Sequence, residues 1–199
     1  MARYVALLRG VNNIGASKRV AMADLQALFE ELGFRDVRTL LNSGNVVFSA
    51  RRTASHGILA RIRTGLARGL SLQASVILLS SREVTSVITG NPFHGPSVNP
   101  SALLVVVPPA RRDLKRLQPL LKSPWAPEEL ALGVRAAYVW CANSVARSRL
   151  WPAVDRALAR SATARNIATM ERIGTALRYP PKHAGAPPRA GVRSGRGRR

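Results

Sequence analysis

The chain has 199 residues, 46% of them hydrophobic, and a formal net charge of +21. This apolar content supports a substantial core and argues against wholesale disorder, and the length suits one large domain or two small ones. No apolar run approaches the ~20 residues of a membrane-spanning helix. The charge favours polyanionic partners: nucleic acid, anionic membrane surfaces or phosphorylated metabolites.

Cys141 is the only cysteine, so no internal disulfide can form. The apolar run at 4–8 is too short for the hydrophobic region of a signal peptide. These two features favour a reducing, cytoplasmic location.

The first ninety residues alternate between strand and helix patterns. Short apolar runs bounded by glycine or turn residues predict strands, and apolar residues at helical spacing predict helices. The expected strands are 4–8, 37–41, 46–48 and 72–80, and the expected helices are 21–32 and 55–70. Ser43 and Gly44 form the turn of a hairpin between the second and third strands. This order is the split βαβ unit of ferredoxin-like folds, with strand order 4-1-3-2.

The rest of the chain repeats the pattern more weakly. The expected elements are helix 81–89, strand 103–107, helix 111–121 with Leu114, Leu117 and Leu121 inward, strand 135–140, and helices 151–159 and 166–177. The fold class is therefore α+β, with two packed ferredoxin-like subdomains. The expected divisions are an N-terminal subdomain (1–90), a connector (91–101), a C-terminal subdomain (102–179) and a disordered basic tail (180–199), which holds six basic residues and no acidic one.

The loop after the first strand has the glycine spacing of a phosphate-binding P-loop. Gly10 and Gly15 fit, but Ala16 stands where that motif requires lysine, and Lys18 comes two positions late. The loop therefore needs another explanation.

That explanation comes from a longer signature, which resembles the family catalogued as domain of unknown function 1697 (DUF1697). The family pattern begins with a strand, L-R-G-I/V-N and a glycine loop with a lysine, and ends with S-G-N-V-x-F. The matching residues are Leu8, Arg9, Gly10, Val11, Asn12, Lys18, Met22, Leu25, Leu32, Gly33, Phe34, Val37, Thr39 and the run from Ser43 to Phe48. Shorter matches follow at Asn91-Pro92-Phe93, Ser148-Arg149-Leu150 and Thr163-Ala164-Arg165-Asn166.

The resemblance implies a bacterial α+β protein with two ferredoxin-like subdomains, which agrees with the pattern of elements. It implies no activity, because the family has none assigned. The chain departs from the pattern at Asn13 and Ala16, where glycine is usual, and at Ile167 and Ala168, where the family has Trp-Asn.

The residues for metal binding or catalysis are too scattered to form a recognisable constellation. His56, His94 and His183 are far apart in sequence, so we expect no metal and no cofactor. Cys141 ends an apolar strand and is expected to be a buried, inert thiol. The neighbouring carboxylates at 30–31 and 128–129 are expected on the solvated surface.

Polar loop residues offer a candidate site for a small anion at the subdomain interface. Its members are Arg9, Asn12, Lys18, Arg165 and Asn166. The alternative is that the asparagines only shape turns and the arginines only tie loops to carbonyls. We expect Asn45 to lie away from Gly10, because the first and third strands are taken to run parallel, so that the turn at 43–45 is purely structural.

Three functions remain open. The first is sequence-tolerant binding to the nucleic-acid backbone through Arg112, Lys115 and Arg116, which share one helix face; the strand 45–50 has a single aromatic residue, Phe48, too few for base stacking. The second is a sensor or enzyme for a small anionic ligand. The third is a homo-oligomeric scaffold. Salt separates the first two, since contacts to phosphates weaken steeply with ionic strength.

We predict that the segment 180–199 is dispensable for folding, because its sequence offers no apolar periodicity to bury. Truncation after Tyr179 should leave the thermal midpoint within about two degrees of the full chain. Differential scanning calorimetry of both proteins checks this, and a large drop would show that the tail docks on the body.

Overall fold

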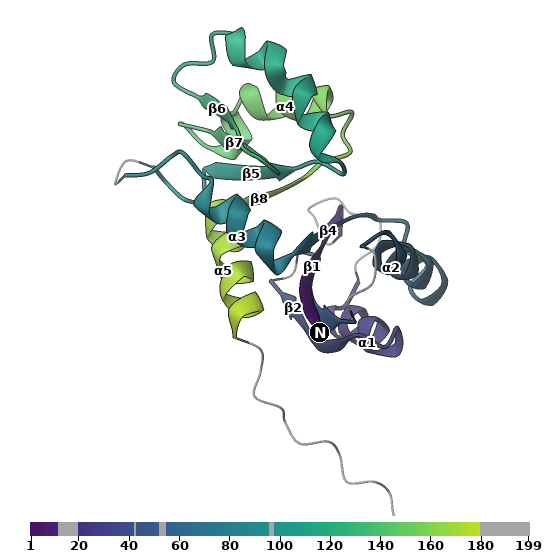
Figure 1. Ribbon diagram of the computed structural model, residues 1–199. Helices are drawn as coiled ribbons and strands as arrows, with labels where there is room; N and C mark the ends of the chain where they lie inside the picture. Colours follow the sequence, from purple (N-terminus) through teal and green to yellow (C-terminus); the bar gives the residue numbers. More distant parts are fainter. Residues whose placement is uncertain (12–19, 42, 52–54, 96–97, 180–199) are drawn as a thin grey trace, which may run out of the picture.

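The computed structural model describes residues 1–11, 20–41, 43–51, 55–95 and 98–179. Two four-stranded antiparallel sheets dominate it (Figure 1). The first contains β1 (Ala2–Arg9), β2 (Arg35–Leu40), β3 (Asn45–Ala50) and β4 (Ser75–Ser80), in the order β2-β3-β1-β4. The second contains β5 (Leu103–Val107), β6 (Glu129–Leu132), β7 (Ala137–Trp140) and β8 (Thr163–Asn166), in the order β6-β7-β5-β8.

The helices complete the same unit in each half. They are α1 (Met22–Glu31), α2 (Ser55–Gly69), α3 (Ser81–Thr89), the 3₁₀ helices η1 (Arg111–Lys122) and η2 (Val145–Arg147), α4 (Leu150–Ala157) and α5 (Ile167–Arg178). Each sheet is built as strand, helix, two strands, helix and strand, and both sheets have equivalent strand orders. The expected fold class, two packed ferredoxin-like units, is therefore confirmed.

Three apolar cores stack through the molecule. The first lies between the first sheet and the helices α1 and α2, and another lies between the second sheet, η1 and α4. The central core is shared: the inner faces of both sheets pack on α3 and α5. Alternate residues of β1 serve different cores, with Val5 and Leu7 facing the centre and Ala6 and Leu8 facing α1 and α2. Burial on both faces explains the uninterrupted apolar run of this strand.

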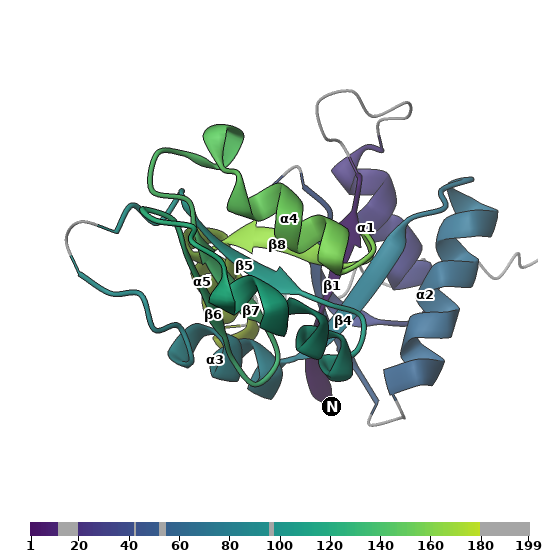
Figure 2. The same cartoon turned by 90° about the horizontal axis from the view of Figure 1, so that it is seen from above.

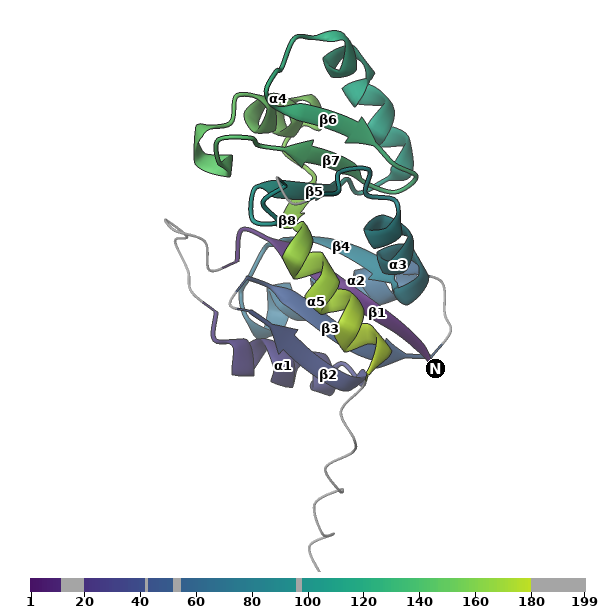
Figure 3. The same ribbon diagram turned by 90° about the vertical axis from the view of Figure 1, so that its left-hand side faces the viewer.

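Helix α5 crosses the inner face of the first sheet over β1 and β3, although it follows β8 of the second sheet (Figure 3). Its last turn is held by two arginines. Arg3 donates hydrogen bonds to the carbonyls of Leu177 and Arg178 at 2.6 and 2.8 Å. Arg38 donates to those of Ala176 and Tyr179 at 3.0 and 2.7 Å. These donors satisfy carbonyls that lack partners within the helix, and their charge suits its C-terminal pole.

The segment 111–122 differs from its expected α-helical form, because it is a 3₁₀ helix with Pro119 inside. A 3₁₀ helix has three residues per turn, so its inward positions recur every third residue. Leu114 and Leu117 are buried as expected, but Leu121 is 46% exposed and Leu120 faces inward instead. The expectation for Leu121 was wrong for this reason.

The expectation that Glu128 lies on the solvated surface was also wrong. Its side chain is buried, at 8% exposure, and one carboxylate oxygen accepts the backbone N–H groups of Arg149 and Leu150 at 3.0 Å each. These groups start α4, so the carboxylate offsets the positive pole of that helix. Glu129 opens β6, a short edge strand that the sequence pattern did not indicate.

The tail at 180–199 lies outside the described residues. Within the described part of the chain, no helix has the length and apolar character needed to cross a membrane.

The arginine clamp on α5 gives a stability prediction. Arg3→Ala and Arg38→Ala should each lower the free energy of unfolding by about 1–2 kcal/mol, because each leaves helix carbonyls without their charged donors. Urea denaturation measures this. Arg35→Ala, an exposed position on the same strand as Arg38, is the control and should change stability by less than about 0.5 kcal/mol; equal losses in all three variants would contradict the clamp.

Candidate functional site

The end of β1 lies beside the start of β3, contrary to expectation. The two strands are antiparallel, with Leu7 opposite Asn45. In this topology α1 returns the chain so that β2 is parallel to β1, and the following hairpin reverses the direction of β3. Asn45 therefore lies next to the end of β1 and not at the far edge of the sheet, so the prediction that it lies away from Gly10 was wrong.

Arg165, on β8, joins the two sheets at this point. Its guanidinium has five N–H donors, and each has an acceptor. The acceptors are the side chain of Asn45 at 2.6 Å, the carbonyls of Leu8 and Ser43 at 2.8 and 2.9 Å, and the Thr163 hydroxyl and Ala164 carbonyl at 2.8 Å each. Three of the five belong to the first sheet and its turn. Arg165 is therefore an inter-sheet joint, and none of its donors is left for a ligand.

The turn that receives Arg165 is itself tightly built. The Asn45 side chain is fully buried and donates to the Leu40 carbonyl at 3.0 Å and to the Ser43 hydroxyl at 2.9 Å. Gly44 has φ +69°, and a Cβ there would stand 2.9 Å from the Cβ of Leu8, so glycine is required on both grounds. The turn at 43–45 is thus part of the joint between the sheets, and whether it is purely structural stays a prediction.

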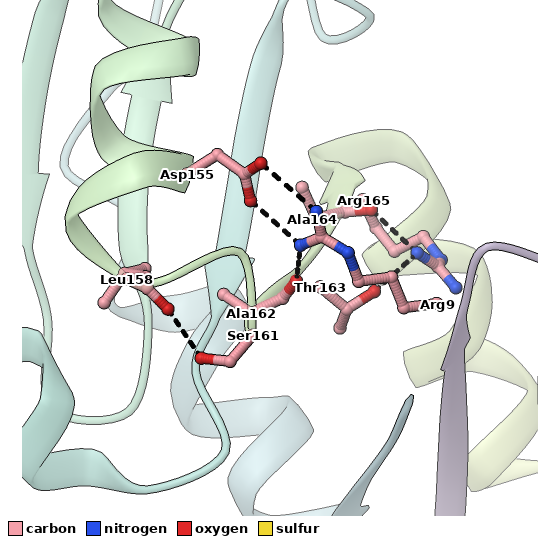
Figure 4. Close-up of polar contacts among 8 residues, drawn as sticks. All are labelled: Arg9, Asp155, Leu158, Ser161, Ala162, Thr163, Ala164 and Arg165. Carbon is pink, nitrogen blue, oxygen red and sulfur yellow. Dashed lines mark hydrogen bonds and ion pairs between the residues drawn. The ribbon is translucent and has the colours of Figure 1, made fainter. Parts of the chain in front are cut away.

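Arg9 makes a second link between the halves (Figure 4). Its guanidinium is bidentate on the Asp155 carboxylate of α4, at 2.9 and 3.1 Å, and also donates to the Ala162 carbonyl. The pair is partly buried, with side-chain exposures of 31% for Arg9 and 18% for Asp155. This geometry is the strong form of an arginine–carboxylate pair.

The charges at this joint do not cancel. Arg9 and Asp155 balance one another, but Arg165 has no carboxylate among its partners. Desolvation by the surrounding protein lowers the pKa of Arg165 to about 10, so the guanidinium remains charged at neutral pH. These three side chains together leave one net positive charge.

The five residues predicted to form an anion site have different outcomes. Arg9, Arg165 and Asn166 come together, whereas Asn12 and Lys18 lie outside the described residues. The Asn166 side chain caps α5 by accepting the Thr169 N–H at 2.9 Å. The alternative stated from the sequence, that these residues shape turns and tie loops to carbonyls, fits these contacts only in part, because Arg9 also pairs with the Asp155 carboxylate and Asn166 caps a helix.

A pocket of about 420 Å³ nevertheless opens beside this joint. Its walls include Ser101, Trp151 and Thr169, none of which was predicted from the sequence. Trp151 lies one helical turn before Asp155 on α4, so helical spacing would have placed the two on one face. We find no comparable signal for Ser101 or Thr169.

A second region, between α2 and η1, is strongly basic. One hollow of about 560 Å³ lies against β4, another of about 380 Å³ lies between η1 and the β6–β7 hairpin, and Arg111 and Val134 line both. Figure 2 shows α2 and η1, the teal helix beside β7, on either side of β4. We call these two hollows, which share Arg111 and Val134, the basic groove; its cationic side chains are Arg63, Arg111, Arg112, Lys115 and Arg135.

The predicted nucleic-acid contacts are only partly in this groove. Arg112 and Lys115 line it, one 3₁₀ turn apart, while Arg116 does not and faces Asp113 at 3.9 Å. Arg135 is tied down by Glu83 at 3.4 Å and the Pro108 carbonyl at 2.8 Å. Burial lowers the pKa of Arg135, and Glu83 partly offsets this effect.

Other chemistry has little support among the residues described. They contain no group of three or more His, Cys, Asp or Glu side chains placed to hold a metal ion. Cys141 is fully buried, as expected, and burial raises the pKa of its thiol, which makes the reactive thiolate scarcer.

The fold and these two regions define a two-sheet α+β protein with a basic groove and a separate interfacial pocket. The chain belongs to the family described as protein of unknown function (DUF1697), whose model matches residues 1–138. Its fold is similar to that of the conserved bacterial protein SP0830 from Streptococcus pneumoniae, with a TM-score of 0.69 and 22% identity, covering 88% of this chain and 98% of that one. No curated protein matches the sequence.

The contacts of Arg165 predict that this residue stabilises the fold. Arg165→Ala should lower the free energy of unfolding by at least about 3 kcal/mol, because buried acceptors from both sheets lose their donor. Arg165→Lys should not rescue it, since an ammonium has three donors and not a planar set of five. Chemical denaturation, with the exposed Arg172→Ala as control, measures this. A loss below about 1 kcal/mol in Arg165→Ala would mean that the side chain is free to serve a ligand.

Proposed function

We propose that the protein binds polyanions, specifically nucleic-acid backbones, along the basic groove and without sequence preference. The observation that carries this proposal is that most cationic side chains of the groove lack an acidic partner. Arg63, Arg111, Arg112 and Lys115 form no ion pair with any carboxylate among the described residues. Among the described residues that line the groove, the one carboxylate is that of Glu83, which pairs with Arg135.

The positions of these side chains suit a chain of phosphates. Arg63 comes from α2, a helix that contains no acidic residue, while Arg111, Arg112 and Lys115 come from η1 on the other side. A groove with cations on both walls attracts a polyanion and releases its condensed counterions on binding.

The lining also argues for backbone contact and against the reading of bases. The residues of the two hollows are basic, polar and aliphatic apart from the acidic Glu83, and include no Phe, Tyr or Trp. Proteins that recognise single-stranded bases usually stack them on such rings. Contacts to phosphates alone position a nucleic acid and carry no sequence information.

The proposal includes a location in the bacterial cytoplasm. A cytoplasmic protein of a bacterium meets nucleic acid at high concentration, and the six basic residues of the segment 180–199 add to its charge. We expect the tail to raise the affinity for nucleic acid. We expect the groove to supply the phosphate contacts that the folded part of the protein makes.

The test compares two double variants of the full chain that carry the same net charge. Arg112→Gln with Lys115→Gln removes two groove cations, and Arg147→Gln with Arg156→Gln removes two exposed cations that line neither hollow. Binding of a fluorescent DNA duplex is measured by anisotropy from low to moderate salt. The plot of log K against log[salt] should become shallower by about 2 for the groove variant, at about 0.9 per lost phosphate contact.

The control variant should retain nearly the wild-type slope. Equal slopes for the two variants would overturn the proposal, because binding would then follow net charge and not the groove.

A further inference from the structure

We infer that the 420 Å³ pocket between the sheets is a second, separate binding site, for a small organic molecule that carries an oxyanion group such as a phosphate or a carboxylate. It shares no lining residue with the basic groove. Its volume lies in the range of small-molecule sites, roughly 300–1,000 Å³.

The charge of the pocket selects the ligand class. Arg9 and Arg165 line it, and Asp155, the one carboxylate among the described residues that is bound to either, is held by Arg9. The Arg165 charge is compensated only by neutral acceptors, whose dipoles stabilise a cation without neutralising it. An anion in this partly desolvated space is therefore attracted more strongly than it would be at the open surface.

The arginines supply the field, but other groups make the direct contacts. All the donors of Arg165 are used within the protein, so a ligand does not need to displace them. Ser101 and Thr169 line the pocket, and their hydroxyls form no hydrogen bond with another described residue. Thr169 also lies in the first turn of α5, where the positive pole of the helix adds to the attraction. These two hydroxyls are available to donate hydrogen bonds to an oxyanion held by the net positive charge.

The remaining wall is apolar. Leu104, Val145 and Trp151 line the pocket together with the polar groups, and the Trp151 side chain is only half-buried. This surface gains little from a bare inorganic ion, whereas it packs well against a ring or an aliphatic body. The ligand is therefore an organic anion. Its binding should change the fluorescence of Trp151.

The experiment uses two probes on the full chain, inorganic phosphate and phenyl phosphate, with binding measured by calorimetry and by tryptophan fluorescence. Phenyl phosphate should bind at least tenfold more tightly than inorganic phosphate. It should change the fluorescence of the wild type but not that of Trp151→Phe, which keeps Trp125 and Trp140. If neither probe binds, or if both bind equally, the inference is wrong.

Matched variants test whether phenyl phosphate binds in this pocket. Ser101→Asp puts a carboxylate at an exposed position on the pocket wall and should weaken phenyl phosphate at least tenfold. Ser123→Asp makes the same charge change at an exposed position outside this pocket and should bind like the wild type. Thr169→Val tests the second hydroxyl with little change of shape, and circular dichroism confirms that each variant is folded.

Binding of phenyl phosphate to the pocket should not depend on binding of DNA to the groove. Ser101→Asp should keep the wild-type salt slope for DNA, whereas the double variant at Arg112 and Lys115 should keep its affinity for phenyl phosphate. If Ser101→Asp and Ser123→Asp weaken phenyl phosphate equally, the probe responds to overall charge and the pocket is not its site.

Discussion

The arrangement of the two sheets depends on the guanidinium of Arg165. Burying a charge without a counterion is costly unless every donor finds an acceptor, and here all five do. Because three acceptors come from the first sheet and its turn, the cost is offset only when the two sheets are in contact. Arg165 also lies two residues before the start of α5, whose far end is held to the first sheet by Arg3 and Arg38. The helix that carries the shared core is thus fixed at both ends.

This joint explains why the residues that suggested the family are so far apart in sequence. Leu8 and Arg9 end β1, Ser43 and Gly44 form the turn that leads into β3 at Asn45, and Arg165 and Asn166 end β8. These three short motifs meet in space through Arg165 and its acceptors. In this chain the motifs therefore hold the two halves together, and the pocket beside the joint lies where the halves meet. The family model itself covers only residues 1–138.

Periodicity was enough to predict the first sheet, since its strands are apolar runs and its helices have one clear apolar face. It failed for β8, whose sequence Thr163-Ala164-Arg165-Asn166 has no strand-like alternation and which forms because β5 supplies its hydrogen-bonding partner. It also failed for η1, where Pro119 and leucines at a spacing of three produce a 3₁₀ helix. The error at Asn45 concerned strand direction, which tertiary topology determines. The hydroxyls of Ser101 and Thr169 gave no signal, because serine and threonine are common in turns and first helical turns.

The net charge of +21 is best understood by asking what each arginine does. Arg3, Arg38 and Arg61 bind only backbone carbonyls among the partners described, as clamps on helix ends, and Arg61 also lies over the ring of Phe34. Arginine suits this task, because its planar set of donors reaches several carbonyls at once. Carbonyls accept hydrogen bonds from these guanidinium groups yet leave their charge uncompensated. The residues that hold the fold together therefore also raise the positive electrostatic potential around it, and such a potential attracts anions from solution.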